Sequence, residues 1–258
     1  MHRFFLPPSE SSDDLLTLRE GDAHHARHVL RLRPGDEVTV LDGAGAEYRC
    51  VVEGESRTIV RLKKFAMRRH PPLPWQVTLY PAVTKAKSMD WVMQKATELG
   101  VARIVPVLTE RSVPQFGSDG SRGKTARWRD LAIEAVKQCG NPWLPRIEEP
   151  ARLGPALTRA EAVDLALVGS LRPARRHPRA VIEQFRAERG RNPATAAVWI
   201  GPEGDFTPAE LDALEAAGVQ PITLGPLVLR AETAALYCLA FLGYEIGAGL
   251  AAQASSDH

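Results

Sequence analysis

The spacing of hydrophobic and polar residues differs between two parts of this 258-residue chain. Up to about residue 70, apolar positions recur at every second residue in short runs, and glycine-containing turns separate the runs. This is the pattern of half-buried strands. The runs are Glu37–Leu41, Tyr48–Val52 and Thr58–Leu62. We therefore expect a small β-barrel in residues 1–70.

A different pattern begins after the proline-rich stretch His70-Pro71-Pro72-Leu73-Pro74. Such a stretch forms a stiff, extended connection, so we place a linker at residues 71–74. Beyond it, helical stripes alternate with short apolar runs of the kind that is buried in parallel sheets. These runs are Val77–Tyr80, Arg103–Leu108, Val163–Val168, Ala197–Ile200 and Pro221–Leu224. We expect an α/β domain over residues 75–250 and a disordered tail at residues 251–258.

Helix boundaries are marked between these runs. Apolar residues at helical spacing over 89–99 and 128–139 each end at a glycine. Thr207-Pro208-Ala209-Glu210 is a capping box with proline at the first helical position. The last helix, expected from about Ala231 to Gly243, is apolar nearly all round. Such a helix is either a central core helix or part of a subunit interface.

Two strand–glycine–helix junctions are the most informative segments of the chain. They are Ile200-Gly201-Pro202-Glu203-Gly204-Asp205-Phe206 and the run from Leu224-Gly225 to Ala234. Glycine turns of this kind bring bare backbone up to a small ligand. Neither junction is a P-loop or a Rossmann fingerprint, because the lysine and the glycine spacing of those motifs are missing. The alternative is ordinary strand-to-helix turn chemistry.

The distribution of charged residues is more informative about an RNA partner than the net charge. The net charge is only +2, but the chain has 26 arginines and 7 lysines. Arginine's planar fork suits phosphate groups and base stacking. One basic run lies within residues 61–70 and another within residues 172–179. Either run by itself is equally typical of a solvated surface, but together, beside candidate ligand loops, they favour RNA binding.

Cysteine and histidine positions argue against metal and disulfide chemistry. Cys50, Cys139 and Cys238 lie far apart, which fits a reducing cytosol, and we interpret Cys139 and Cys238 as packed thiols. His24 and His28 share a helical face but lack an evident third ligand, so we expect no metal. The apolar stretch 234–252 contains Glu245 and three glycines, so we expect no membrane span.

Several further segments resemble one protein family. Gln94–Val101 reads QKATELGV, and Glu110-Arg111-Ser112-Val113 and Gln138-Cys139-Gly140 follow it in the family's order. The stretches 1–5 and 24–31 resemble its N-terminal domain. With the two glycine loops, these motifs resemble the SPOUT methyltransferases that methylate N3 of a uridine in 16S ribosomal RNA. Asp205 and Asn141 depart from the pattern, which usually has glycine and arginine there.

The resemblance carries expectations for the whole molecule. It implies a SPOUT-type α/β domain with a C-terminal deep trefoil knot, preceded by a small PUA-like β-barrel. It also implies S-adenosylmethionine as cofactor, 16S rRNA in the small ribosomal subunit as partner, a homodimer and a cytoplasmic location. Two alternatives remain: a SPOUT enzyme acting on another RNA such as tRNA, and a non-catalytic RNA-binding protein. Asp205 favours the second alternative, because its carboxylate lies in the cofactor loop.

The site residues follow from the two loops and the resemblance. We expect the backbone and apolar side chains of one set to bind the cofactor: Val168, Gly169, Ile200, Gly201, Pro202, Glu203, Gly204, Leu224, Gly225, Leu227 and Leu229.

The catalytic and RNA-binding candidates are charged. Uridine N3 is protonated at neutral pH, so the reaction needs a base or a cation that stabilises the uridinate. Arg230 is the candidate cation, and the alternative is a structural ion pair with Glu232. Glu203 and Glu232 are candidate bases, and either could equally cap a helix N-terminus. The RNA-binding candidates are Arg3, Arg27, Arg31 and Lys85.

Overall fold

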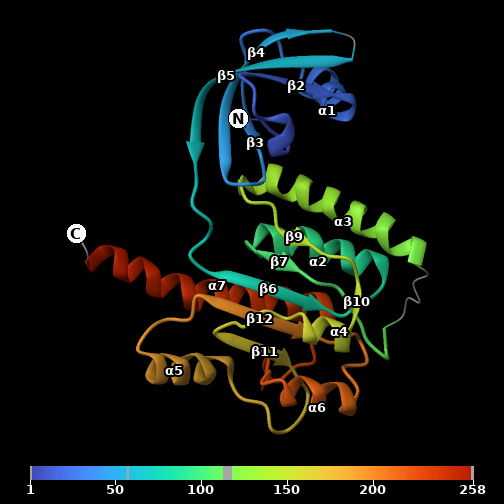
Figure 1. The fold of residues 1–258 in the computed structure, drawn as a ribbon, viewed down its shortest axis with the longest axis vertical. Helices are drawn as coiled ribbons and strands as arrows, with labels where there is room; N and C mark the ends of the chain where they lie inside the picture. Colours follow the sequence, from blue (N-terminus) through green and yellow to red (C-terminus); the bar gives the residue numbers. More distant parts are fainter. Residues whose placement is uncertain (1, 57, 113–117, 257–258) are drawn as a thin grey trace. The chain divides into compact units, whose positions relative to one another are not determined.

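A computed structural model describes residues 2–56, 58–112 and 118–256, and its fold is drawn in Figure 1. Met1, Val113 and residues 257–258 of the expected tail lie outside the described residues. The chain divides into two compact units. The first comprises residues 1–72 and 133–144, and the second comprises residues 73–132 and 145–258.

The first unit is built on a five-stranded sheet with the order β1-β3-β4-β5-β2. Its strands are β1 (His2–Phe5), β2 (Leu15–Arg19), β3 (Glu37–Leu41), β4 (Ala46–Glu55) and β5 (Ile59–Arg69). β1 and β3 are parallel, and the other pairs are antiparallel. Alternate residues of these strands are buried in one core, as the period of two predicts.

Short helices complete the first unit: η1 (Pro8–Glu10), α1 (Glu20–His24) and the π-helical η2 (His25–Val29). The three histidines of the sequence motif therefore lie on one helical segment. The rings of His24 and His28 are in contact, with centroids 4.6 Å apart. No cluster of three metal-binding side chains is found within the described parts of the chain.

Residues 133–144 belong to the first unit through contacts that the sequence pattern does not indicate. Lys137 forms an ion pair with Asp22 at 3.2 Å. The Arg3 guanidinium donates to the Gln138 carbonyl at 3.1 Å. Trp143 forms backbone bridges with Gly43 and its neighbour. The end of one long helix is thus part of the N-terminal unit.

The second unit is a six-stranded parallel sheet with the order β13-β11-β12-β6-β7-β9. Its strands are β6 (Gln76–Pro81), β7 (Arg103–Ile104), β9 (Arg146–Ile147), β11 (Leu165–Gly169), β12 (Thr195–Ile200) and β13 (Gln220–Ile222). β8 (Val107–Leu108) and β10 (Ala151–Arg152) form a separate two-stranded ladder. The alternation of strands and helices agrees with the α/β fold expected from the sequence.

The apolar run Arg103–Leu108 is not one strand. β7 ends at Ile104 and β8 begins at Val107, so the run contributes to two ladders. Pro106 lies between them and has no backbone N–H with which to continue a ladder. The expectation of a single strand was wrong for that reason.

The helices of this unit are α2 (Ala86–Glu98), α4 (Leu153–Thr158), α5 (Pro178–Arg189), α6 (Pro208–Ala216) and α7 (Ala231–Ser256). The helix α3 (Ser118–Cys139) begins in this unit and ends in the other. The capping box is present, because Thr207 and Glu210 exchange hydrogen bonds at the start of α6. α7 continues to Ser256, into the stretch where the sequence predicts a disordered tail.

α7 packs against α2, β6 and β12 (Figure 1). One face of α7 contributes Ala235, Cys238, Leu242 and Ile246 to the largest core cluster. Its other face leaves Tyr237 and Tyr244 45% and 74% exposed. The apolar helix is therefore a core helix on one side and an uncovered apolar surface on the other. No helix within the described residues is long and apolar enough to cross a membrane.

Candidate functional site

Three loops leave the carboxyl ends of neighbouring strands in the second unit. β13, β11 and β12 are adjacent and parallel, so the loops that follow them meet at one edge of the sheet. They are loop 170–177 after β11, loop 201–207 after β12 and loop 223–230 after β13. The carboxyl edge of an open parallel sheet is where ligands bind in such folds.

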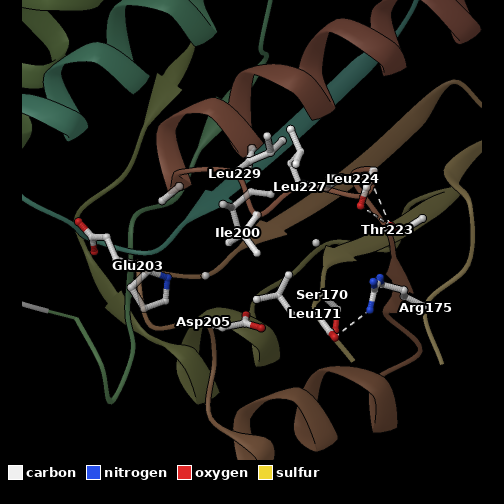
Figure 2. A pocket seen from close by; sticks show the side chains of 17 residues that line it. Ser170, Leu171, Arg175, Ile200, Glu203, Asp205, Thr223, Leu224, Leu227 and Leu229 are labelled. Carbon is white, nitrogen blue, oxygen red and sulfur yellow. Dashed lines mark hydrogen bonds between the residues drawn. The ribbon is translucent and has the colours of Figure 1, made fainter. Parts of the chain in front are cut away.

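A pocket lies between these loops. Its apolar wall comes from Ile200 and from three leucines of the third loop, Leu224, Leu227 and Leu229. Figure 2 shows that Ser170, Arg175 and Asp205 lie across the pocket from this wall. Glu203 and Thr223 also line the pocket. A pocket with one apolar wall and a few polar groups fits a ligand that has both an apolar and a charged part.

Two glycines allow the backbone to approach the pocket. A β-carbon on Gly201 would come within 3.0 Å of the Asp205 carboxylate and of the Phe206 nitrogen. Gly225 has a φ of 110°, in the region that side chains disfavour. Both positions therefore require glycine for reasons of shape, as the sequence motif indicates.

Asp205 keeps the turn that a glycine would make. Its φ is 59°, in the left-handed region, which aspartate tolerates better than most residues. Its backbone N–H donates to the Pro202 carbonyl at 2.9 Å, and its carboxylate accepts the Phe206 N–H at 2.8 Å. Aspartate at this position thus keeps the loop closed and adds a negative charge to the pocket.

Neighbouring segments hold loop 201–207 in place. The Arg111 guanidinium donates to the Gly204 carbonyl. The carboxylate of Glu210, only 8% exposed, accepts the N–H groups of both Glu110 and Thr207 at 2.9 Å. The Glu110-Arg111 motif therefore supports the loop from outside the pocket.

The sequence predicts Val168 and Gly169, at the end of β11, as cofactor-binding residues, but it predicts none in loop 170–177 itself. Ser170 is buried, and its hydroxyl accepts the Arg172 N–H at 3.1 Å. One terminal nitrogen of Arg175 donates to the carbonyls of Leu171 and Arg172, both at 2.8 Å. Because Gly169 ends a buried strand, the carboxyl-edge rule could have identified the residues that follow it.

The predicted cofactor residues largely surround this pocket. Nine of the eleven line it: Gly169, Ile200, Gly201, Pro202, Glu203, Leu224, Gly225, Leu227 and Leu229. Val168 does not line it, because its side chain is buried in a core cluster with Tyr80 and Trp199. Gly204 lies outside the lining and is exposed, with the Arg111 side chain next to it.

The catalytic candidates take three different positions. Glu203 lines the pocket. Arg230 is exposed at the end of loop 223–230, and Glu232 is half-buried in the first turn of α7. Among the described residues, the Arg230 guanidinium pairs with no carboxylate, so the alternative of an ion pair with Glu232 is not what the structure has.

The RNA-binding candidates also differ in their surroundings. Arg3 caps the end of α3 through its bond to Gln138, and its guanidinium packs on Gly140. Arg27 forms an ion pair with Glu55 at 2.7 Å. Arg31 is exposed, with a φ of 55°. Lys85 is exposed and directly precedes α2.

The cysteines are divided by burial. Burial raises the pKa of the Cys238 thiol and raises that of Cys50 to about 11, so both are inert packed thiols. Cys139 is exposed at the end of α3, so its interpretation as a packed thiol was wrong. The buried face of α3 ends at Val136, and Cys139 is the last residue of the helix, where its side chain is exposed.

Comparisons with known proteins agree with both units. Residues 71–243 match the family model described as RNA methyltransferase domain, and residues 18–65 match the RNA methyltransferase PUA domain. The chain is 31% identical to ribosomal RNA small subunit methyltransferase E of Aquifex aeolicus, over 94% of this chain and 99% of the relative. The protein of that name from Bacillus subtilis is 27% identical, over 95% and 97%.

The chain is also similar to solved structures of methyltransferases. A putative methyltransferase from Legionella pneumophila, in complex with bound S-adenosylmethionine, has 29% identity and a TM-score of 0.83 over 94% of this chain and 96% of its own. Ribosomal RNA small subunit methyltransferase E from Neisseria gonorrhoeae, also bound to S-adenosylmethionine, has 26% identity and a TM-score of 0.82 over 95% and 97%.

Proposed function

This chain belongs to the family of RNA methyltransferases that carry an N-terminal PUA domain, and we propose that it methylates N3 of a uridine in 16S rRNA of the small ribosomal subunit. The observation that carries the proposal is the pocket. Both glycine loops that resemble the family's motifs line it, and a third loop from the same sheet edge closes it.

The pocket residues fit S-adenosylmethionine. Leu224, Leu229 and Ile200 form an apolar surface for the adenine ring, and Gly201 and Gly225 leave backbone groups accessible to it. Ser170 and Asp205 supply polar partners for the ribose and methionine parts. When bound, this cofactor supplies a methyl group that is already activated on a sulfonium. The protein's own task is to orient the uracil and to manage its proton.

Arg230 is suited to the developing uridinate. Loss of the N3 proton places negative charge on the uracil oxygens, and a guanidinium stabilises that charge with directed N–H donors. Arg230 is exposed beside the apolar wall, and in the described parts of the chain no carboxylate neutralises it. The guanidinium is therefore available to a substrate.

Glu203 is the better placed of the two candidate bases. Glu203 is an exposed residue at the edge of the pocket, whereas Glu232 lies in the first turn of α7, where a carboxylate also stabilises the helix N-terminus. Glu203 receives the N3 proton within the site, and Arg230 stabilises the charge that the departing proton leaves.

The basic residues of the first unit serve RNA binding. Arg31 and the exposed residues Arg61, Lys63, Arg68 and Arg69 of β5 contact phosphates, and Lys85 does so from the second unit. Arg27 and Arg3 are partly engaged within the unit and contribute less. In keeping with the resemblance, the C-terminal segment forms a deep trefoil knot and the protein acts as a homodimer in the cytoplasm, without a metal.

The test is methyl transfer from labelled S-adenosylmethionine to intact small subunits, protein-free 16S rRNA and tRNA, all from cells that lack this modification. We expect transfer to small-subunit RNA, and N3-methyluridine as the modified nucleoside in a mass-spectrometric digest. At saturating cofactor, a Glu203→Gln variant should transfer the methyl group more slowly.

Two results would contradict the proposal. Transfer to tRNA alone would identify a different RNA substrate. Calorimetric binding of the cofactor without transfer to any RNA would identify a non-catalytic binding protein.

A further inference from the structure

The charged residues around the pocket are of both signs. Among the described residues that line it, three are charged: Arg175 on loop 170–177, and Glu203 and Asp205 on loop 201–207. The lining thus carries one cation and two anions. S-adenosylmethionine has the opposite set, with a sulfonium, an ammonium and one carboxylate. Matched potentials of this kind give binding sites their specificity.

Within the described part of the chain, only one terminal nitrogen of the Arg175 guanidinium forms hydrogen bonds, and the other two nitrogens remain available as donors. A single terminal nitrogen makes both hydrogen bonds, to the carbonyls of Leu171 and Arg172. The other terminal nitrogen and Nε make none with the described residues. The turn fixes the guanidinium at the edge of the pocket, where Figure 2 shows it across from the leucine wall. A fixed guanidinium with two free donors matches a carboxylate.

Ser170 adds a second donor beside it. Its oxygen accepts the Arg172 N–H, and its own hydroxyl proton donates to no residue in the described part of the chain. Ser170 is 5% exposed and lines the pocket, so its hydroxyl is available as a donor to a ligand there. A guanidinium and a hydroxyl from one loop form a small site for an anionic group.

We propose that loop 170–177 recognises the methionine carboxylate of the cofactor, with Arg175 as its main partner and Ser170 as a second donor. This inference rests on the proposed function, because it takes S-adenosylmethionine as the ligand. The neighbouring basic residues have other partners. Arg172 pairs with Asp212 and Glu215, and Arg176 donates to Gln220. Arg175 is the cation that this loop presents to the pocket.

The experiment compares two ligands that differ by one group. Calorimetry would measure the dissociation constants of S-adenosylmethionine and of its decarboxylated analogue, which keeps the sulfonium and the amine. For the unaltered protein we expect the analogue to bind about tenfold more weakly, the size of one charge-assisted contact at a partly exposed site. For Arg175→Met we expect most of this difference to disappear, with only the smaller contribution of Ser170 to the carboxylate remaining.

Arg176→Met is the matched control, since its guanidinium lies next in the chain but outside the pocket lining. It should keep the full difference between the two ligands. Thermal melting of both variants checks the fold. Binding of the analogue is an internal standard, because it needs an intact pocket without needing the carboxylate contact.

Several outcomes would overturn the inference. If the unaltered protein binds the two ligands equally, the carboxylate has no partner in the pocket. If Arg175→Met weakens both ligands equally, Arg175 only shapes its turn. If the variant leaves the ligand difference intact but lowers the salt dependence of RNA binding, Arg175 serves a phosphate of the RNA. A protein that binds neither ligand would instead contradict the proposed function itself.

Discussion

The structure favours one of the two roles that the sequence leaves open for Arg230, a structural ion pair or contact with the substrate. By sequence it follows three apolar residues and stands two positions before Glu232, which is compatible with a structural ion pair. In the structure it is exposed, and within the described residues it has no carboxylate partner. An arginine without a structural partner beside a ligand pocket is available for substrate.

Replacing Arg230 with alanine should therefore lower the rate of methyl transfer and leave the fold intact. The loss of one donor that stabilises transition-state charge costs about a hundredfold or more in turnover. Cofactor affinity should change little, because Arg230 does not line the pocket. A higher pH should partly restore the rate, since more of the uridine N3 is then ionised. Single-turnover kinetics across a pH series measures both effects.

Arg189→Ala, at the exposed end of α5, is a suitable control and should keep the normal rate. A stable Arg230→Ala variant with a normal rate would refute the catalytic role. A shared loss of thermal stability in Arg230→Ala and Glu232→Ala would point to a structural pair.

Among the secondary-structure elements, β11 and β12 depend on Asp164 for their alignment. Asp164 directly precedes β11, and its carboxylate accepts the N–H groups of Ala194 and Thr195 at the start of β12. It also pairs with Arg191 at 2.6 Å. The Arg191 hydrogen bond is the largest cause that lowers its pKa from the usual 3.8 to about 2, and the two backbone N–H bonds add to it. These strands position two of the three pocket loops.

Asp164→Asn should destabilise the protein in a pH-dependent way. A depressed carboxylate pKa contributes stability above its unfolded value of 3.8, and the contribution is lost as the pH falls through about 2. We expect a loss of about 1 kcal/mol in the free energy of unfolding at pH 7, because the Arg191 partner is about half exposed and solvent screens the pair. By the same linkage, about half of that difference should remain at pH 3. Urea denaturation at both pH values measures it.

Glu183→Gln serves as the comparison, because it removes an ion pair whose partners, Arg179 and Glu183, are both exposed. Exposed pairs contribute about 0–1 kcal/mol. An Asp164→Asn penalty that is equal at pH 7 and pH 3 would show that the carboxylate charge is not what holds the strands.

At the level of the whole molecule, α7 and the loop before it both carry exposed apolar side chains. Tyr237 and Tyr244 are exposed on α7, and Leu227 and Val228 are each 75% exposed beside the pocket. The rings of Tyr237 and Phe241 are in contact, with centroids 5.9 Å apart. An apolar helix that leaves large side chains in water favours an interface, so we expect a second copy of the chain to cover α7.

We therefore expect a dimer at micromolar concentration in analytical ultracentrifugation. The double change Tyr237→Glu and Tyr244→Glu should shift it toward monomer, because a charge buried in the interface is costly. Phe65→Glu, at an exposed apolar position of the first unit, should leave the dimer intact. A monomer in the unaltered protein would refute the expectation.

Much of the fold was determined by chemistry that acts over a few residues. The period of two, the helical stripes and the capping box of Thr207 and Glu210 predicted elements that the structure contains. Gly201 and Gly225 marked the loops, because their shape requirements are local. Such features can be derived from sequence, since each depends on neighbours along the chain.

The order of the strands in space was decided by the tertiary structure alone. Loop 170–177 lines the pocket because β11 lies between β13 and β12, and no local pattern carries that order. The same holds for the partners of charged side chains. Arg3 caps α3 from 135 positions away, and Arg27 meets Glu55 across the first unit. Whether an arginine faces a ligand, a carbonyl or a carboxylate depends on residues distant in the chain, which packing brings together.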